Sequence, residues 1–180
     1  MNMDRNTGEL FSQDVRTWQQ QLIRGVLLSL VFVGPLAVIG GSYYAYTTQT
    51  TEQIPFYLVA YGLLLVVTFW RRVPYAVKVG VFLALIYALG VLDFSQDGRG
   101  GSGRLFLLGL VSVAALFVSR RASVLIMIVA LLTFVGFGVA YTMGWISIPP
   151  SQEVNSTDVS GWVSNTMVLL LSLIHISEPT

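Results

Sequence analysis

The chain has 180 residues, of which 54% are hydrophobic and 11% are charged, and its formal net charge is +1. A soluble domain carries about 25% charged residues, so this composition excludes a water-soluble globular protein. The near-neutral charge gives no support to a nucleic-acid-binding surface. Cysteine is absent, which excludes disulfides, cysteine-based zinc or iron–sulfur sites and a thiol nucleophile.

Residues 1–24 form a polar and then amphipathic cytoplasmic segment. Phe11, Val15, Trp18 and Leu22 share one face if this segment is helical. Two interpretations remain open at this stage. The segment is either a helix that lies on the membrane surface, with Trp18 at the level of the headgroups, or the juxtamembrane start of the first span.

Apolar runs separated by short polar intervals predict membrane-spanning helices. We expect spans at about residues 25–46, 54–70, 75–92, 105–118 and 123–141, and a sixth from Trp162. Pro35 in the first span leaves the carbonyl of Val31 without its helical donor and is expected to bend the helix. The fourth apolar run is the shortest, and it crosses the membrane only if the residues that flank it lengthen the helix.

Besides the short polar connector at residues 47–55, two longer connectors are predicted to lie outside. Residues 93–104, DFSQDGRGGSGR, are rich in glycine but lack the lysine and the preceding strand of a phosphate-binding loop, so we expect a flexible external loop. The second external connector covers residues 146–161. Four acids fall in these two connectors and are either solvated or contact a cation or polar ligand: Asp93, Asp97, Glu153 and Asp158.

The positions of the basic residues predict the orientation. If the N-terminus is inside, all ten lysines and arginines except Arg99 and Arg104 are cytoplasmic. We therefore expect a multi-pass protein of the cytoplasmic (inner) membrane with its N-terminus inside. The pairs Arg71-Arg72 and Arg120-Arg121 are the predicted topology-determining residues. Binding of anionic lipid or of a cytoplasmic partner is their alternative role.

The interiors of the runs contain no Asp, Glu, Lys or His. This weighs against an ion-coupled transporter, an intramembrane protease with an aspartate pair and a haem-binding bundle. We predict no catalytic, cofactor-binding or metal-ligating residue and no cofactor. The polar residues inside are expected to form hydrogen bonds at helix contacts, and the small residues of the fifth span to allow close packing. These residues are Thr68, Ser112, Thr133, Ser164 and Asn165, and Gly136, Gly138 and Ala140.

The last ten residues, 171–180, read LSLIHISEPT. They resemble a translated sequencing adapter, because one reading frame of a transposon-end adapter encodes all ten positions. We expect this tail not to be native, so that the sixth span is partly artefactual and His175 and Glu178 carry no chemistry. The natural chain is then expected to continue past Leu170.

The stretches GSGRLFLLGLVSVAALFVSRRAS at 101–123 and NSTDVSGW at 155–162 resemble the N-terminal membrane module of bacterial sensor histidine kinases. The predicted fold is an all-α polytopic membrane bundle of about six transmembrane helices, with residues 25–170 as the sensor-like domain. The resemblance implies a signal-input module of a truncated two-component sensor histidine kinase, which passes its signal to a missing cytoplasmic output domain.

The same resemblance implies a homodimer in the lipid bilayer and a cytoplasmic response regulator as the partner of the missing kinase. The parent protein would be an ATP-dependent protein histidine kinase. The chain itself has neither the phospho-accepting histidine motif nor the ATP-binding boxes, so whether it belongs to an enzyme stays open. The alternative is a stand-alone small integral membrane protein, such as a permease, channel subunit or scaffold.

Overall fold

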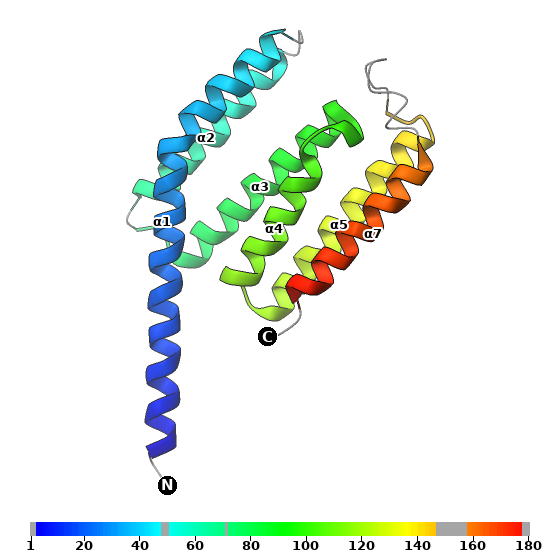
Figure 1. The fold of residues 1–180 in the computed structure, drawn as a ribbon. Coiled ribbons are helices and arrows are strands. Elements are labelled where there is room, and N and C mark those ends of the chain that lie inside the picture. Colours follow the sequence, from blue (N-terminus) through cyan, green and yellow to red (C-terminus); the bar gives the residue numbers. More distant parts are fainter. Residues whose placement is uncertain (1–2, 48–50, 71, 147–157, 178–180) are drawn as a thin grey trace. The chain divides into compact units, whose positions relative to one another are not determined.

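The computed structural model describes residues 3–47, 51–70, 72–146 and 158–177, and its regular structure there is entirely helical (Figure 1). The helices are α1 (Met3–Thr47), α2 (Ile54–Phe69), α3 (Tyr75–Asp97), α4 (Gly103–Phe117), α5 (Arg120–Thr142) and α7 (Val159–Ser177). Two short 3₁₀ turns, Thr51–Gln53 and Gly98–Gly100, precede α2 and follow α3.

Four helical stretches are long and apolar enough to cross a membrane. They are Gln21–Thr47, Thr51–Phe69, Tyr75–Asp97 and Arg120–Thr142. The prediction of an all-α membrane helical bundle is thereby confirmed. The 15 residues of α4 extend about 22 Å, which is less than the ~30 Å hydrocarbon core, so a complete crossing by α4 stays a prediction.

The chain forms two compact units, unit 1 (Met1–Phe82) and unit 2 (Leu83–Thr180), and the boundary falls inside α3. Each unit has its own pattern of contacts.

Unit 1 is built around the hairpin of α1 and α2 (Figure 1). Two tyrosine rings of α2 lie against two glycines of α1. A Cβ atom added at Gly34 would lie 2.5 Å from the Tyr61 ring, and one added at Gly41 would lie 3.3 Å from the Tyr57 ring. Glycine at these positions lets the two helices approach closely, as is common in membrane helix pairs.

The proline in α1 is accommodated by its neighbour. α1 remains helical through Pro35, and the hydroxyl of Tyr61 donates a hydrogen bond of 3.0 Å to the carbonyl of Val31. This is the carbonyl that proline was predicted to deprive of its backbone donor. An unsatisfied carbonyl is costly in an apolar environment, so this bond stabilises the bend-prone part of α1 against α2.

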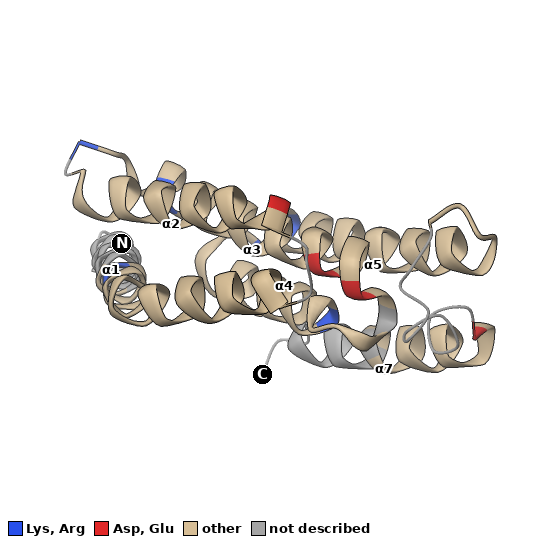
Figure 2. Cartoon of the chain, turned by 90° about the horizontal axis from the view of Figure 1, so that it is seen from above, with Lys and Arg blue, Asp and Glu red and all other residues tan. Residues whose placement is uncertain are grey.

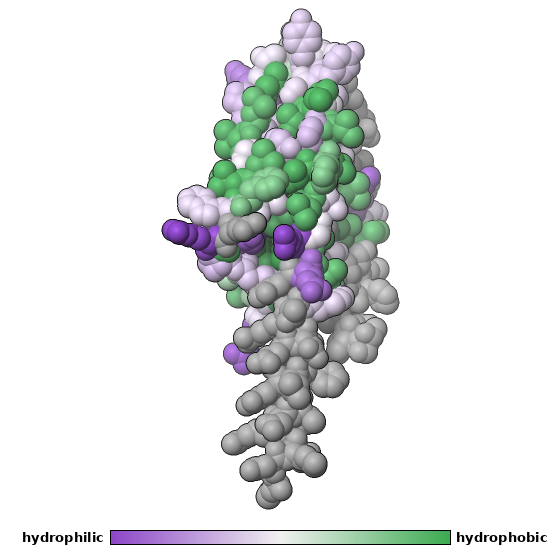
Figure 3. All heavy atoms as spheres, turned by 90° about the vertical axis from the view of Figure 1, so that its left-hand side faces the viewer, coloured by the Kyte–Doolittle hydropathy of each residue, from purple (hydrophilic) through white to green (hydrophobic). Residues whose placement is uncertain are grey.

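The outer face of the hairpin is apolar. Phe32, Leu36 and Ile39 of α1 are 79%, 71% and 66% exposed. Figure 3 shows green apolar side chains over most of this face and purple hydrophilic side chains gathered at one level below them. A face of this kind fits contact with lipid chains rather than with water.

Unit 2 contains the packed helices α4, α5 and α7, with α5 and α7 side by side (Figure 1). Its core consists of apolar side chains that are almost fully buried: Leu107, Leu110, Val111 and Ala114 of α4, and Ala130 and Phe134 of α5. Gly90 of α3 also faces α4, because a Cβ atom there would lie 3.2 Å from Phe106.

The end of α3 differs from the sequence prediction. The third span was expected to end at residue 92 and to be followed by a flexible loop, but α3 continues to Asp97. Phe94 is only 1% exposed, and the longer helix places its ring in the core of unit 2. Gly98, with φ of 54°, then ends the helix. The flexible-loop prediction is therefore wrong for residues 93–100, because tertiary burial of Phe94 outweighs the polar local sequence.

Candidate functional site

Five aromatic rings from three helices form a cluster in unit 2, which we call the aromatic junction. Its members are Phe94 of α3, Phe134, Phe137 and Tyr141 of α5, and Trp162 of α7. The ring centroids of Phe94 and Phe134 are 5.6 Å apart with their planes at 75°, and those of Phe94 and Phe137 are 5.4 Å apart with planes at 24°. Edge-on and offset pairs of this kind add about 0.5–1.5 kcal/mol each beyond simple burial.

Trp162 fixes the start of α7 in the junction. Its side chain is only 4% exposed, and its ring centroid lies 5.0 Å from that of Phe134 and 6.0 Å from that of Tyr141. A Cβ atom added at Gly138 would lie 3.1 Å from the indole, so this glycine leaves room for the ring. The predicted close contact at Gly138 is confirmed, whereas Gly136 faces open space.

Tyr141 joins the end of α3 to α5. Its ring is 1% exposed, and its hydroxyl donates a hydrogen bond to the carbonyl of Phe94. That carbonyl belongs to the last turn of α3. The bond therefore ties the end of α3 to α5.

Asp93 connects α3 to the start of α4. Its carboxylate accepts a hydrogen bond of 2.5 Å from the backbone N–H of Gly103, the first residue of α4. Ser102, which directly precedes α4, makes no capping bond with its own side chain. A negative charge at a helix N-terminus is favourable because it meets free N–H groups and the positive end of the helix dipole. Asp93 was expected to be a loop acid, but it caps a helix.

Asp158 has a similar role at the start of α7. Its two carboxylate oxygens accept hydrogen bonds of 3.1 Å from the backbone N–H groups of Ser160 and Gly161. It is thus the N-cap of α7. Among the residues that the structure describes, no group of three or more His, Asp or Glu side chains is placed to hold a metal ion. Glu153, the remaining acid of the second connector, lies outside the described residues.

A polar contact joins α4 and α7 next to the junction. Arg104 Nη1 donates a hydrogen bond of 3.3 Å to Asn165 Oδ1. Elsewhere in unit 2, the hydroxyls of Tyr87 and Thr133 are 2.9 Å apart and link α3 to α5. Asn165 and Thr133 therefore make the predicted bonds at helix contacts.

Thr68 and Ser112 use their hydroxyls differently. They donate hydrogen bonds of 2.7 Å and 2.9 Å to the carbonyls of Leu64 and Leu108, each four residues earlier in the same helix. Neither bond reaches a second helix, so these two residues do not play the predicted part at a helix contact.

The aromatic junction joins the ends of α3 and α5 to the start of α7. Its hydroxyl, on Tyr141, is already bound to a carbonyl, and the rest of its surface consists of rings and glycine. Because closely packed interiors shift between discrete arrangements, a change at the ends of α3 and α5 would be felt by Trp162 and hence by α7.

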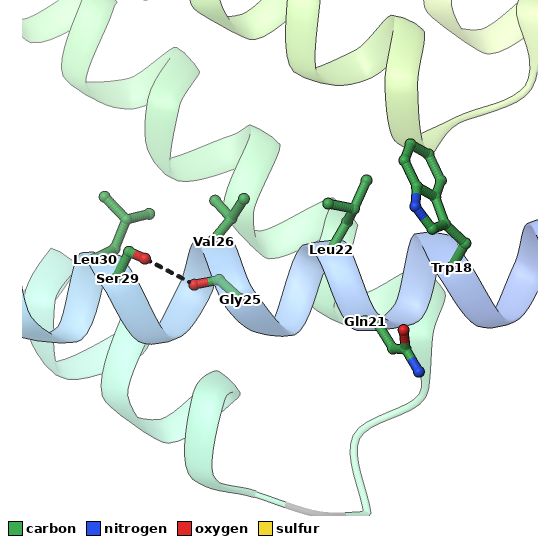
Figure 4. Close-up of a pocket in the computed structure, with 7 residues that line it drawn as sticks. All are labelled: Trp18, Gln21, Leu22, Gly25, Val26, Ser29 and Leu30. Atoms are coloured by element: carbon green, nitrogen blue, oxygen red, sulfur yellow. Dashed lines mark hydrogen bonds between the residues drawn. The ribbon is translucent and has the colours of Figure 1, made fainter.

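A groove also runs along α1 in unit 1 (Figure 4). It has a volume of about 530 Å³ and is lined by Trp18, Gln21, Leu22, Gly25, Val26, Ser29 and Leu30. The hydroxyl of Ser29 donates to the carbonyl of Gly25 at 3.0 Å. All the lining residues come from one helix and no charged group is among them, so the groove does not bring together the polar groups that a ligand site needs.

The predicted topology-determining arginines are exposed where the structure describes them. Arg72 lies in the turn between α2 and α3, and Arg120 and Arg121 form the start of α5. Arg71 lies outside the described residues. Figure 2 shows few charged residues, and the helices are tan over most of their length.

Sequence reasoning missed the aromatic junction as a unit. One signal was present, since Phe134, Phe137 and Tyr141 are spaced to share one face of a helix. Nothing local indicated that Phe94 and Trp162 would join them, because both stand at the edges of polar connectors.

Comparison with known proteins gave one result. A family model, MASE11, matches residues 17–177. The match spans all six described α-helices, wholly or in part, and extends to residue 177, past the start of the predicted adapter-derived tail. No match was found among curated proteins or among solved structures.

Proposed function

Since the chain belongs to the MASE11 family of membrane-associated sensor domains, we propose that it is the signal-input module of a larger signalling protein. The observation that carries this proposal is the family match over residues 17–177. The four long apolar helices agree with the membrane location that the family implies.

In the proposed mechanism, α7 is the output element. A signal at the ends of α3 and α5 changes the packing of the aromatic junction, and Trp162 transfers that change to α7. The support for this is the density of contacts that Trp162 makes with α5, together with the bond of Arg104 to Asn165. A ligand need only favour one of two packings to shift the equilibrium between them.

We further propose that the output domain is the kinase of a two-component system, with a response regulator as its cytoplasmic partner. The support is the resemblance of residues 101–123 and 155–162 to sensor histidine kinases. The parent protein would act as a homodimer, with the lipid bilayer as its surroundings.

An independent long sequencing read across the gene, past the codon for Leu170, tests this proposal. We expect an open frame that continues into a cytoplasmic linker and a histidine-kinase core. A different signalling domain would refute the kinase and keep the input module. A stop codon soon after Leu170 would contradict the input module and favour the stand-alone membrane protein.

The same read tests the origin of the tail. We propose that residues 171–180 derive from a sequencing adapter, on the strength of the ten matching codons. We expect other codons in their place in the independent read. If LSLIHISEPT reappears, the tail is native, and His175 returns as a residue of α7.

We propose the cytoplasmic (inner) membrane with the N-terminus inside. The arginine pairs support this orientation. Arg120 and Arg121 stand at the start of α5, where the positive end of the helix dipole makes cations unfavourable. Stabilisation of the helix therefore does not explain their position, whereas the preference of basic residues for the cytoplasmic side does. The cysteine-free chain suits accessibility mapping. In intact cells, an impermeant maleimide should label Thr51→Cys, placed outside, and spare Ser119→Cys. The reverse pattern would refute the orientation.

A further inference from the structure

A hollow lies at one end of unit 1, where α1, the end of α2 and the start of α3 meet. Its volume is about 490 Å³, and its lining includes Arg24 and Leu27 of α1, Thr68 of α2, and Tyr75 and Lys78 of α3. In contrast to the groove along α1, three helices contribute to this hollow, and two of them bring a cation.

Among the side chains of unit 1 that the structure describes, no acidic one lies close to Arg24 or Lys78. The one acidic side chain described there is Glu52, in the turn before α2. Thr68, which lines the hollow, lies at the opposite end of α2, about 24 Å from Glu52 along the helix axis. Two cations that line one cavity repel each other, so a bound anion would stabilise this arrangement.

The walls of the hollow are amphipathic. Ile23 and Leu27 line it, and each is only 2% exposed, whereas Arg24 is exposed and Lys78 is half-buried. Arg24 and Lys78 both lie near the ends of their apolar stretches, at the level where such side chains reach from the hydrocarbon towards the headgroups. Figure 3 shows hydrophilic side chains gathered just below the apolar surface of this unit.

We propose that this hollow binds the phosphate group of an anionic ligand. Arg24 would offer a planar pair of donors to two phosphate oxygens, and Lys78 a compact positive charge. Thr68 is not a donor to this ligand, because its hydroxyl hydrogen is used in the bond to Leu64. The phosphate belongs either to a membrane lipid or to a solute. This site is distinct from the aromatic junction and does not depend on which output domain follows.

The test uses the full chain, purified in detergent and in nanodiscs of phosphatidylcholine. In detergent, native mass spectrometry compares the binding of phosphatidylglycerol with that of phosphatidylcholine. In nanodiscs without anionic lipid, calorimetric titration with inorganic phosphate and pyrophosphate at constant ionic strength measures the binding of a solute. The variants are Arg24→Gln, Lys78→Gln and Lys78→Arg, and the control is Arg121→Gln, which removes an exposed arginine of unit 2.

We expect at least one of the two sources to bind the unaltered chain. Arg24→Gln and Lys78→Gln should each weaken that binding roughly tenfold, since a charge-assisted hydrogen bond is lost. Lys78→Arg should retain most of the affinity, and Arg121→Gln should change it little. Binding of phosphatidylglycerol alone would identify a lipid site, and binding of phosphate or pyrophosphate a solute site.

Two results would overturn the proposal. One is no preference for phosphatidylglycerol over phosphatidylcholine together with no binding of phosphate or pyrophosphate. The other is an equal loss in Arg24→Gln, Lys78→Gln and Arg121→Gln, which would show a general charge effect. Far-UV circular dichroism of each variant, and the retained affinity of Lys78→Arg, separate loss of the site from loss of the fold.

Discussion

The two units hold their helices together by different means. In unit 1, α1 and α2 meet through tyrosine rings over glycines, and a hydroxyl of α2 satisfies the carbonyl of Val31 that Pro35 leaves free. In unit 2, the rings of the aromatic junction pack on one another and on Gly138. Among the described residues, unit 1 thus combines ring-on-glycine contacts with a hydroxyl-to-carbonyl bond at a weak point of α1, whereas unit 2 combines its hydrogen bonds with a densely packed cluster of rings.

This difference predicts how each unit responds to change. A hydrogen bond contributes about 1 kcal/mol net, and its loss leaves neighbouring side chains in place. A packed cluster resists small displacements and then changes arrangement as a whole. The proposed role of unit 2 in passing a signal to α7 fits the second behaviour, and the substitutions below test the contrast.

The largest effect is expected from Trp162→Ala. Removing the buried indole leaves a cavity in the aromatic junction and should lower the free energy of unfolding by about 3–5 kcal/mol. Trp145→Ala is the matched control, because Trp145 is 74% exposed and its loss should change stability by less than about 0.5 kcal/mol. SDS titration in mixed micelles, followed by circular dichroism, measures both values. Equal effects would show that the junction is not a core.

Gly103→Ala is expected to come second. The added methyl would lie 2.7 Å from the ring of Phe94, which is buried and cannot move aside, so overpacking should cost about 1–3 kcal/mol. Gly109→Ala on the same helix has no atom within 4 Å of the added methyl and should be neutral or slightly stabilising. The same SDS titration compares the two. A neutral Gly103→Ala would mean that the corner between α3 and α4 is loosely packed.

Gly34→Ala tests the corresponding contact in unit 1. The added methyl meets the ring of Tyr61, which is half-buried and can turn away at the expense of its bond to Val31. We expect a loss of about 1 kcal/mol, smaller than that of Gly103→Ala. Gly40→Ala, where the added methyl meets open space, is the control. Thermal unfolding in detergent ranks the loss of stability in Gly34→Ala against the losses in Gly103→Ala and Gly40→Ala. A larger loss at Gly34 than at Gly103 would reverse the contrast between the units.

The smallest effect is expected from a double-mutant cycle of Tyr61→Phe and Pro35→Ala. Tyr61→Phe alone leaves the carbonyl of Val31 unsatisfied and should cost about 1 kcal/mol. In the Pro35→Ala background, the N–H of residue 35 bonds that carbonyl, so the same change should cost almost nothing. SDS titration of the four proteins gives the coupling energy. A coupling of zero would show that the hydroxyl does not compensate for the proline.

Tyr43→Phe serves as the control for this cycle. Tyr43 is 71% exposed on α1, so loss of its hydroxyl should leave the free energy of unfolding unchanged. A loss equal to that of Tyr61→Phe would point to a general effect of tyrosine hydroxyls at the membrane surface.

Hydrophobic patterning predicted the all-α class and the approximate positions of the apolar helices, since these depend on composition alone. It failed where distant residues decide the outcome. The free carbonyl of Val31 was predicted, but its donor, Tyr61, lies 30 residues away. Phe94 stands in a polar stretch and is helical only because rings of α5 and α7 surround it. The convergence of Arg24 and Lys78 likewise appears only when α1 and α3 are brought together.

The continuity of α1 has a mechanical consequence. Its apolar part begins at Gln21, so the helical residues 3–20 extend about 27 Å beyond it. Nucleation is the costly step of helix formation, and the membrane span already provides the nucleus, so this polar extension needs only to propagate. A rigid extension of this length amplifies any tilt of the span. A tilt of about 10° in the span would displace the far end of the extension by roughly 5 Å, a distance close to one helical turn.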